Sequence, residues 1–167
     1  MTASEHIYSV LFISDDGAVR APIAAALLNA VAKGRWRASH AVIGEAAPLH
    51  PLLRDALATA GAQAPDGTAP NWAEALANGQ GFDFIFILAE AKEGVSLPGP
   101  ADTAVLAHWP IPRPNLAGGT QAEHSARLAE IIRMIRRRID LLMELPATGL
   151  DRLARQRHAE SIHQRAD

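Results

Sequence analysis

The chain contains no cysteine, and this absence removes several kinds of chemistry at once. Disulfide bridges, thiolate metal sites and catalysis by a thiol are all excluded. No apolar run approaches the ~18 residues that a membrane-spanning helix needs. The N-terminal segment MTASEHIYSV also lacks the basic and apolar regions of a secretion signal. We therefore expect a cytoplasmic protein that does not associate with a membrane.

A strong charge of either sign is also lacking. The chain has 16 Lys and Arg residues against 18 Asp and Glu residues, which gives a formal net charge of −2. This balance provides no electrostatic reason to expect nucleic acid as a partner. The seven histidines show no metal-ligand spacing, so neither a metal nor a cofactor is expected.

Apolar residues make up 49% of the 167 residues, which is ordinary for one globular domain. Their periodicity predicts strands at 10–13, 35–43, 81–88 and 103–107, and helices at 21–33, 48–60, 72–77 and 121–145. This order predicts a three-layer α/β/α fold with a four-stranded parallel sheet. Residues 1–145 are expected to form this domain. Residues 146–167 are expected to be a polar tail, partly helical at best, with a protein partner or a second copy of the chain as its candidate contacts.

The first strand, loop and helix organise the rest of the chain. The apolar strand ends at Ile13, a loop runs from Ser14 to Arg20, and Pro22 opens an Ala- and Leu-rich helix. Proline is favoured in the first helical turn because its missing N–H would have no intrahelical partner there. Backbone N–H groups at such a loop and helix N-terminus suit an anion. The predicted anion-binding residues are Asp16, Gly17, Ala18, Val19 and Arg20.

The segment 14–22, SDDGAVRAP, resembles the Cys-x5-Arg-(Ser/Thr)-Pro loop of the low-molecular-weight protein tyrosine phosphatases and thioredoxin-linked arsenate reductases. A second landmark is the segment 108–114, HWPIPRP, which precedes a long helix and resembles the family's Trp-containing loop that ends in Asp-Pro. The resemblance covers residues 7–145 and implies the fold of this family. It also implies roles for four positions: a Cys nucleophile, an Arg that binds phosphoryl oxygens, a Ser or Thr that supports the thiolate, and an Asp general acid.

In this chain the four positions are occupied by Ser14, Arg20, Ala21 and Arg113, so only the arginine is kept. A serine hydroxyl stays protonated and needs a neighbouring base, and a carboxylate with a pKa near 4 is a poor one. Loss of the general acid alone costs about 10²–10⁴-fold in rate. We therefore predict a catalytically silent phosphatase relative that binds an anionic or phosphorylated ligand or a protein partner. An active phosphatase or other hydrolase using Ser14 and Arg20 remains the alternative.

Whether the loop still binds oxyanions is left open by the sequence. Arg20 and the helix dipole favour an anion, the dipole by roughly 0.3–1 kcal/mol. Asp15 and Asp16 oppose it through charge repulsion if they face inward. Arg20 in an ion pair with either carboxylate would fill the pocket from within.

A regulator of a different class is a further alternative. The strand followed by Asp15 and Asp16 also resembles the start of a response-regulator receiver, whose carboxylates hold Mg²⁺. A receiver needs an acceptor Asp at the end of its third strand, whereas Asp55 lies within a predicted helix. Two carboxylates alone would bind Mg²⁺ weakly.

Three other features carry two interpretations each. Arginines 133, 136, 137 and 138 lie mostly off the apolar stripe of the last helix. They form either a phosphate site or a solvated outer face. His108 is either a residue bordering the site or a loop anchor. Trp72 and Trp109 either line the rim of the site or pack in the core.

Overall fold

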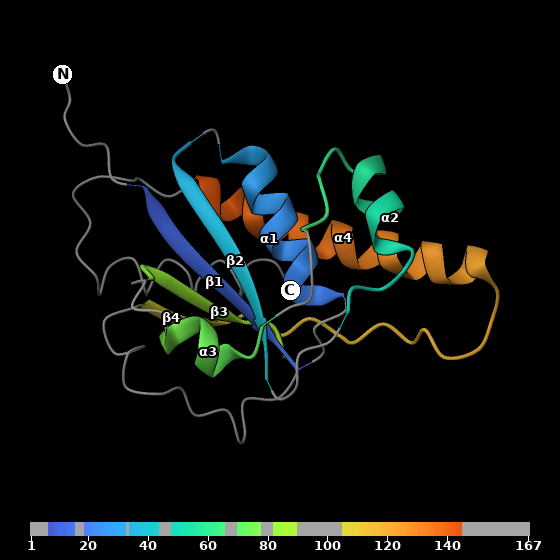
Figure 1. Ribbon diagram of the computed structural model, residues 1–167. Coiled ribbons are helices and arrows are strands. Elements are labelled where there is room, and N and C mark those ends of the chain that lie inside the picture. The colour runs from blue at the N-terminus through green and yellow to red at the C-terminus, as the bar shows by residue number, and fades with distance from the viewer. Residues whose placement is uncertain are drawn as a thin grey trace.

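The computed structural model describes residues 7–15, 19–32, 34–43, 48–65, 70–77, 82–89 and 105–144 (Figure 1). Its strands are β1 (Tyr8–Ser14), β2 (Trp36–Val42), β3 (Phe84–Ile87) and β4 (Val105–His108). Its helices are α1 (Arg20–Val31), α2 (Leu53–Thr59), α3 (Trp72–Ala77) and α4 (Gln121–Met143).

The four strands form one sheet in the order β2-β1-β3-β4, and every neighbouring pair is parallel. The predicted fold class is therefore confirmed. Because all strands run the same way, their carboxyl ends lie at one end of the sheet, which we call its carboxyl edge. The segments that follow β1, β3 and β4 begin there, where ligand sites of parallel sheets lie.

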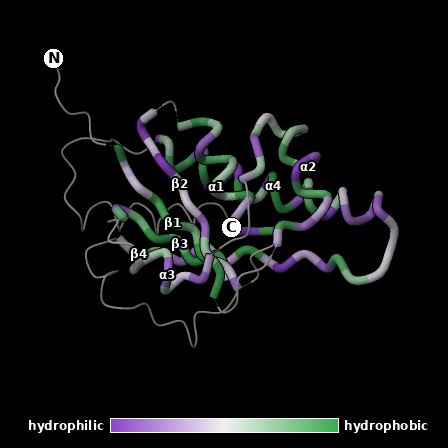
Figure 2. Tube along the Cα trace, viewed as in Figure 1, coloured by the Kyte–Doolittle hydropathy of each residue, from purple (hydrophilic) through white to green (hydrophobic). Residues whose placement is uncertain are grey.

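Apolar side chains cover both faces of the sheet. On one face, residues of β1 and β3 such as Phe12 and Phe86 pack with α1, α2 and α4 in the larger cluster. On the other face, Leu11, Ile13 and Ile85 pack with α3, whose Trp72 is half-buried. Figure 2 shows hydrophobic residues along β1, β3 and much of α1, whereas β2 is more hydrophilic. This arrangement gives the three layers.

Helix α1 is buried from Arg20 to Leu28, which explains why its sequence is apolar on all sides. Helix α4 instead buries one stripe, as predicted, and begins with a capping box in which Thr120 and Glu123 satisfy each other's backbone N–H groups. The buried members of the stripe are Leu128, Ile131, Ile132, Ile135, Ile139 and Leu142.

An aromatic stack lies below the carboxyl edge of the sheet. The ring of Trp109, which is fully buried, lies 4.0 Å from that of Phe86, and Phe86 lies 5.5 Å from Phe12. The ring Nε2 of the neighbouring His108 lies 2.7 Å from the carbonyl oxygen of Ala89. Core packing for Trp109 and a loop-anchoring contact for His108 are thus confirmed, and both hold the segment after β4 in place.

The two largest differences from the predicted element boundaries are the starts of α2 and β3. Helix α2 begins at Leu53 rather than at residue 48, because Pro51 disfavours helical geometry at His50, whose ring Nδ1 accepts the N–H of Leu52 at 3.1 Å. Strand β3 begins at Phe84 rather than at residue 81, and just before it the Asp83 carboxylate accepts the N–H of Ser9 at 2.9 Å.

The predicted polar tail, residues 146–167, lies outside the described residues, and so do the contacts proposed for it. Among the helices of the described part of the chain, none has the length and hydropathy to cross a membrane.

Candidate anion site

The loop between β1 and α1 begins at a fully buried Ser14, whose carbonyl oxygen accepts the N–H of Ile43 at 3.0 Å. The helix begins at Arg20, and the N–H of Ile23 donates to the carbonyl of Val19 at 3.0 Å. Of the five predicted anion-binding residues, Val19 and Arg20 are described, whereas 16–18 lie outside the described ranges.

Arg20 is the central residue of the site. Its side chain is fully buried, and Nη1 donates to the carbonyl oxygen of Ile111 at 2.9 Å, with a longer contact of 3.5 Å to that of Leu88. Leu88 directly follows β3, and Ile111 lies three residues after β4. The guanidinium of Arg20 therefore joins the segments that leave three neighbouring strands and is held in one position by them.

The carboxylate of Asp15 lies between two arginines. Its Oδ1 accepts from Nη2 of Arg20, and its Oδ2 lies 3.2 Å from Nη2 of Arg113. The side chains of Asp15 and Arg113 are 44% and 56% exposed, whereas that of Arg20 is inaccessible. The Arg20–Asp15 ion pair, one of the outcomes left open by the sequence, is therefore present. We call these three residues the arginine clamp.

The two arginines favour the ionised form of this carboxylate. Partial burial acts to raise the pKa of Asp15, but the charges of Arg20 and Arg113 and their hydrogen bonds outweigh it, so the pKa lies below its ordinary value. A carboxylate with a lowered pKa is a weaker base, so Asp15 is less able to accept a proton from the Ser14 hydroxyl than an ordinary aspartate. The arginine clamp carries one net positive charge in total.

Arg113 brings a permanent cation to the position where the resemblance implies a general acid. A guanidinium stays protonated at all physiological pH values, so it cannot give a proton to a leaving group. It is well suited to holding an oxyanion, because its N–H donors match the oxygens of carboxylate and phosphate. The arrangement therefore favours anion binding over proton transfer.

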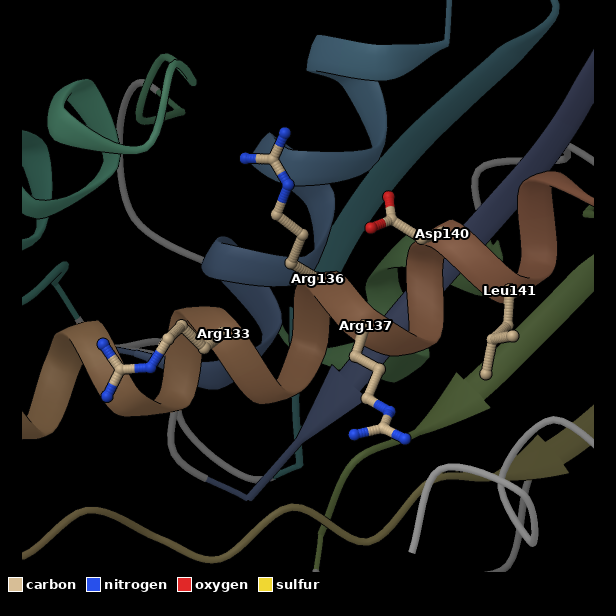
Figure 3. Close-up of a pocket in the computed structure, with 5 residues that line it drawn as sticks. All are labelled: Arg133, Arg136, Arg137, Asp140 and Leu141. Carbon is tan, nitrogen blue, oxygen red and sulfur yellow. The ribbon is translucent and has the colours of Figure 1, made fainter.

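The second arginine-rich region lies on α4. Arg133, Arg136 and Arg137 are exposed and line a hollow of about 380 Å³ together with Asp140 and Leu141 (Figure 3). Figure 3 shows the side chains of Arg136 and Arg137 pointing away from each other. Nη1 of Arg136 donates to the carbonyl of Ala60 at 2.9 Å, just after the end of α2. We call these three arginines the α4 arginines.

The arginines of this helix lie mostly off the apolar stripe, as predicted, and the exception is Arg138, which is buried. Arg138 follows Ile135 by three residues and so shares its face of the helix. The other three arginines are exposed, as the interpretation of a solvated face requires.

A receiver-like metal site gains no support from the described part of the chain. Asp55 lies in the first turn of α2 rather than at the end of a strand. Among the described residues, no group of three His, Asp or Glu side chains is placed to hold a metal ion. The pairing of Asp15 with two arginines also occupies one of the two carboxylates that the Mg²⁺ hypothesis needs.

Sequence reasoning missed the two main-chain acceptors of Arg20. The carbonyls of Leu88 and Ile111 leave no signal in residue identity, because every residue has a carbonyl. Only the three-dimensional neighbourhood of the strand ends reveals them.

No protein-family model and no curated protein sequence matches the chain. Solved structures do resemble it. An arsenate reductase from Archaeoglobus fulgidus is 29% identical with a TM-score of 0.59, over 78% of this chain and 98% of the other. A low-molecular-weight protein tyrosine phosphatase from T. tengcongensis is 19% identical with a TM-score of 0.66, over 82% and 98% of the two chains. A thioredoxin-dependent arsenate reductase from Corynebacterium glutamicum is 24% identical with a TM-score of 0.60, over 86% of this chain and 63% of the other.

Proposed function

We propose that this chain, which has the fold of the low-molecular-weight tyrosine phosphatases and arsenate reductases, is a catalytically silent relative that recognises an anionic or phosphorylated ligand. The ligand is either a small oxyanion or a charged group on a protein partner. The proposal separates two tasks that a phosphatase site performs together, namely holding the phosphoryl oxygens and breaking the ester bond.

The observation that carries the proposal is the Arg113–Asp15 ion pair at 3.2 Å. In this pair the guanidinium of Arg113 contacts the Asp15 carboxylate, which Arg20 also binds. Arg113 occupies the sequence position where the resemblance implies a proton donor. The site therefore has one more cation and one fewer acid than ester hydrolysis requires. Positive charge strengthens oxyanion binding, but it does not replace protonation of the leaving group.

The nucleophile position supports the same conclusion. Ser14 is buried at the end of β1, and its hydroxyl needs a base to become nucleophilic. The carboxylate next to it in sequence, Asp15, is paired with two arginines and has a lowered pKa. Arsenate reduction by thiol chemistry is also excluded, because the chain has no cysteine to supply electrons.

The anion-holding task is retained in Arg20. Its buried guanidinium is fixed by the carbonyl of Ile111, so its position does not depend on a ligand. A fixed donor loses little conformational entropy on binding, which is the advantage of preorganisation.

A hydrolysis assay tests the silent part of the proposal. We expect the wild type to hydrolyse an aryl phosphate no faster than the Ser14→Ala variant, with no vanadate-sensitive fraction. Hydrolysis that vanadate inhibits and that Ser14→Ala abolishes would contradict the proposal and establish the alternative, an active hydrolase using Ser14 and Arg20.

A further inference from the structure

We propose that Asp15 is an internal, exchangeable ligand of the arginine clamp, and that a phosphate-type dianion binds by displacing its carboxylate from Arg20 and Arg113. This inference rests on the proposed function and adds the regulation of the site. In the absence of ligand the site is occupied by the chain itself, and the ligand binds by competition with Asp15.

The arginine clamp contains one immobile member and two movable ones. Arg20 is inaccessible to solvent, and its Nη1 is bound to the carbonyl of Ile111 at 2.9 Å. The side chains of Asp15 and Arg113 are each about half exposed. Rotation of the Asp15 side chain into solvent therefore needs no change in the core, and it leaves the guanidinium of Arg20 in place to receive another oxyanion.

Charge repulsion requires an incoming phosphate to displace the Asp15 carboxylate rather than to bind beside it. If the Asp15 carboxylate remained on Arg20, an incoming phosphate group would meet a negative charge within a few ångströms. Their repulsion would act in a partly buried place, where water screens it less than on an open surface. The two anions therefore exclude each other from the arginine clamp.

Charge also favours a dianion as the occupant. A carboxylate offers one negative charge, whereas a phosphate monoester carries close to two and has three oxygens to accept hydrogen bonds. The guanidinium groups of Arg20, which follows β1, and of Arg113, which follows β4, are suited to bind such a phosphate group from two sides. A single carboxylate such as acetate should therefore bind more weakly than phosphate.

The test is a calorimetric titration of the full chain with inorganic phosphate and, separately, with acetate. The variants are Asp15→Asn, which keeps the shape of the side chain, and Asp15→Ala, which removes it. We expect both variants to bind phosphate at least about tenfold more tightly than the wild type, because the competing charge is gone. Asp55→Asn, an equal charge change on an exposed residue of α2, should leave phosphate affinity unchanged.

Arg113→Gln in the Asp15→Asn background tests the second cation. Because the Arg113 side chain is more than half exposed, its removal should not disturb the fold, and we expect it to weaken phosphate binding several-fold. Circular dichroism and thermal unfolding of each variant show whether the fold is intact.

Three results would overturn the inference. These are equal phosphate affinity in wild type and Asp15→Asn, no phosphate binding by either Asp15 variant with the fold intact, or acetate binding as tight as phosphate. None of these results would show turnover, so they leave the catalytic silence of the proposed function standing, although a complete absence of phosphate binding would remove phosphate as its ligand. Conversely, Ser14-dependent hydrolysis by the wild type would contradict that proposal without deciding whether Asp15 competes with phosphate.

Discussion

Two groups of arginines in the described part of the molecule differ both in their spacing along the sequence and in how they place their charges. In the arginine clamp, guanidinium groups from two different segments converge on one carboxylate, and one of them is fully buried. The α4 arginines come from a single helix, are exposed, and two of them point away from each other (Figure 3). The first region brings its charges together, whereas the second spreads them into solvent.

The difference shows that convergence of charge needs tertiary structure. Successive residues of a helix are about 100° apart around its axis, so arginines adjacent in sequence, such as Arg136 and Arg137, diverge. Arg20 and Arg113 are 93 positions apart in sequence and meet only because the parallel sheet places the carboxyl ends of β1 and β4 at one edge. A cluster in space is therefore better evidence for an anion site than a cluster in sequence.

The largest expected effect is that of removing the buried cation. Arg20→Met should destabilise the fold by about 2–4 kcal/mol, because the carbonyl of Ile111 loses this donor and the carboxylate of Asp15 loses one of its two arginine partners. Urea unfolding measures this change. Arg133→Met on α4 is the matched control, and it should shift stability by no more than about 0.5 kcal/mol. Equal effects for the two substitutions would remove the contrast between the regions.

A smaller effect is expected within the α4 arginines themselves. Arg136→Ala should cost about 0.5–1 kcal/mol, because it removes the hydrogen bond to Ala60 and a positive charge at the end of α2. The same substitution at Arg137, for which no such contact is seen among the described residues, should cost less. Thermal unfolding of the two variants side by side measures the difference, and a larger loss for Arg137→Ala would contradict it.

The arginine clamp should contribute to the pH dependence of stability through Asp15. The pKa of Asp15 is lower in the folded chain than its ordinary value, so its ionised form stabilises the fold above the unfolded-state pKa. This contribution is lost as pH falls through the folded pKa. The stability difference between wild type and Asp15→Asn should therefore shrink between about pH 5 and pH 2. A stability difference that grows as the pH falls would contradict the lowered pKa of Asp15 in the folded chain.

The smallest expected effect concerns repulsion on α4. Arg133 and Arg137 are four residues apart, and like charges at this spacing destabilise a helix by roughly 0.2–0.5 kcal/mol. Arg133→Gln should therefore be neutral or slightly stabilising at low ionic strength, and added salt should remove the gain. A clear loss of stability, seen by urea unfolding, would mean that the side chain makes a contact of structural importance.

Much of the fold could be predicted from the sequence because burial leaves a periodic signal. The continuous apolar run of β3 and the stripe of α4 both identified their elements. The short loop between Ser14 and Arg20 also indicated the candidate site, and an ion pair of Arg20 with Asp15 or Asp16 was one of the outcomes that the sequence left open.

The rest depended on contacts that residue identity does not encode. The carbonyl acceptors of Arg20 belong to Leu88 and Ile111, apolar residues whose side chains give no sign of a polar role. Arg138 is buried although its type predicts exposure, because its helical position outweighs the preference of its charge for water. The contact of Arg113 with Asp15 follows from where the segment after β4 turns, which no local pattern fixes.

The most direct test of the central claim is a crystal structure of Asp15→Asn soaked with tungstate, a tetrahedral dianion that is easily located by its scattering. We expect tungstate within hydrogen-bonding distance of both Arg20 and Arg113, with the side chain of residue 15 turned away. Tungstate bound instead at the α4 arginines, or absent from the arginine clamp at a concentration that saturates the variant in solution, would contradict the claim that this clamp is the anion site.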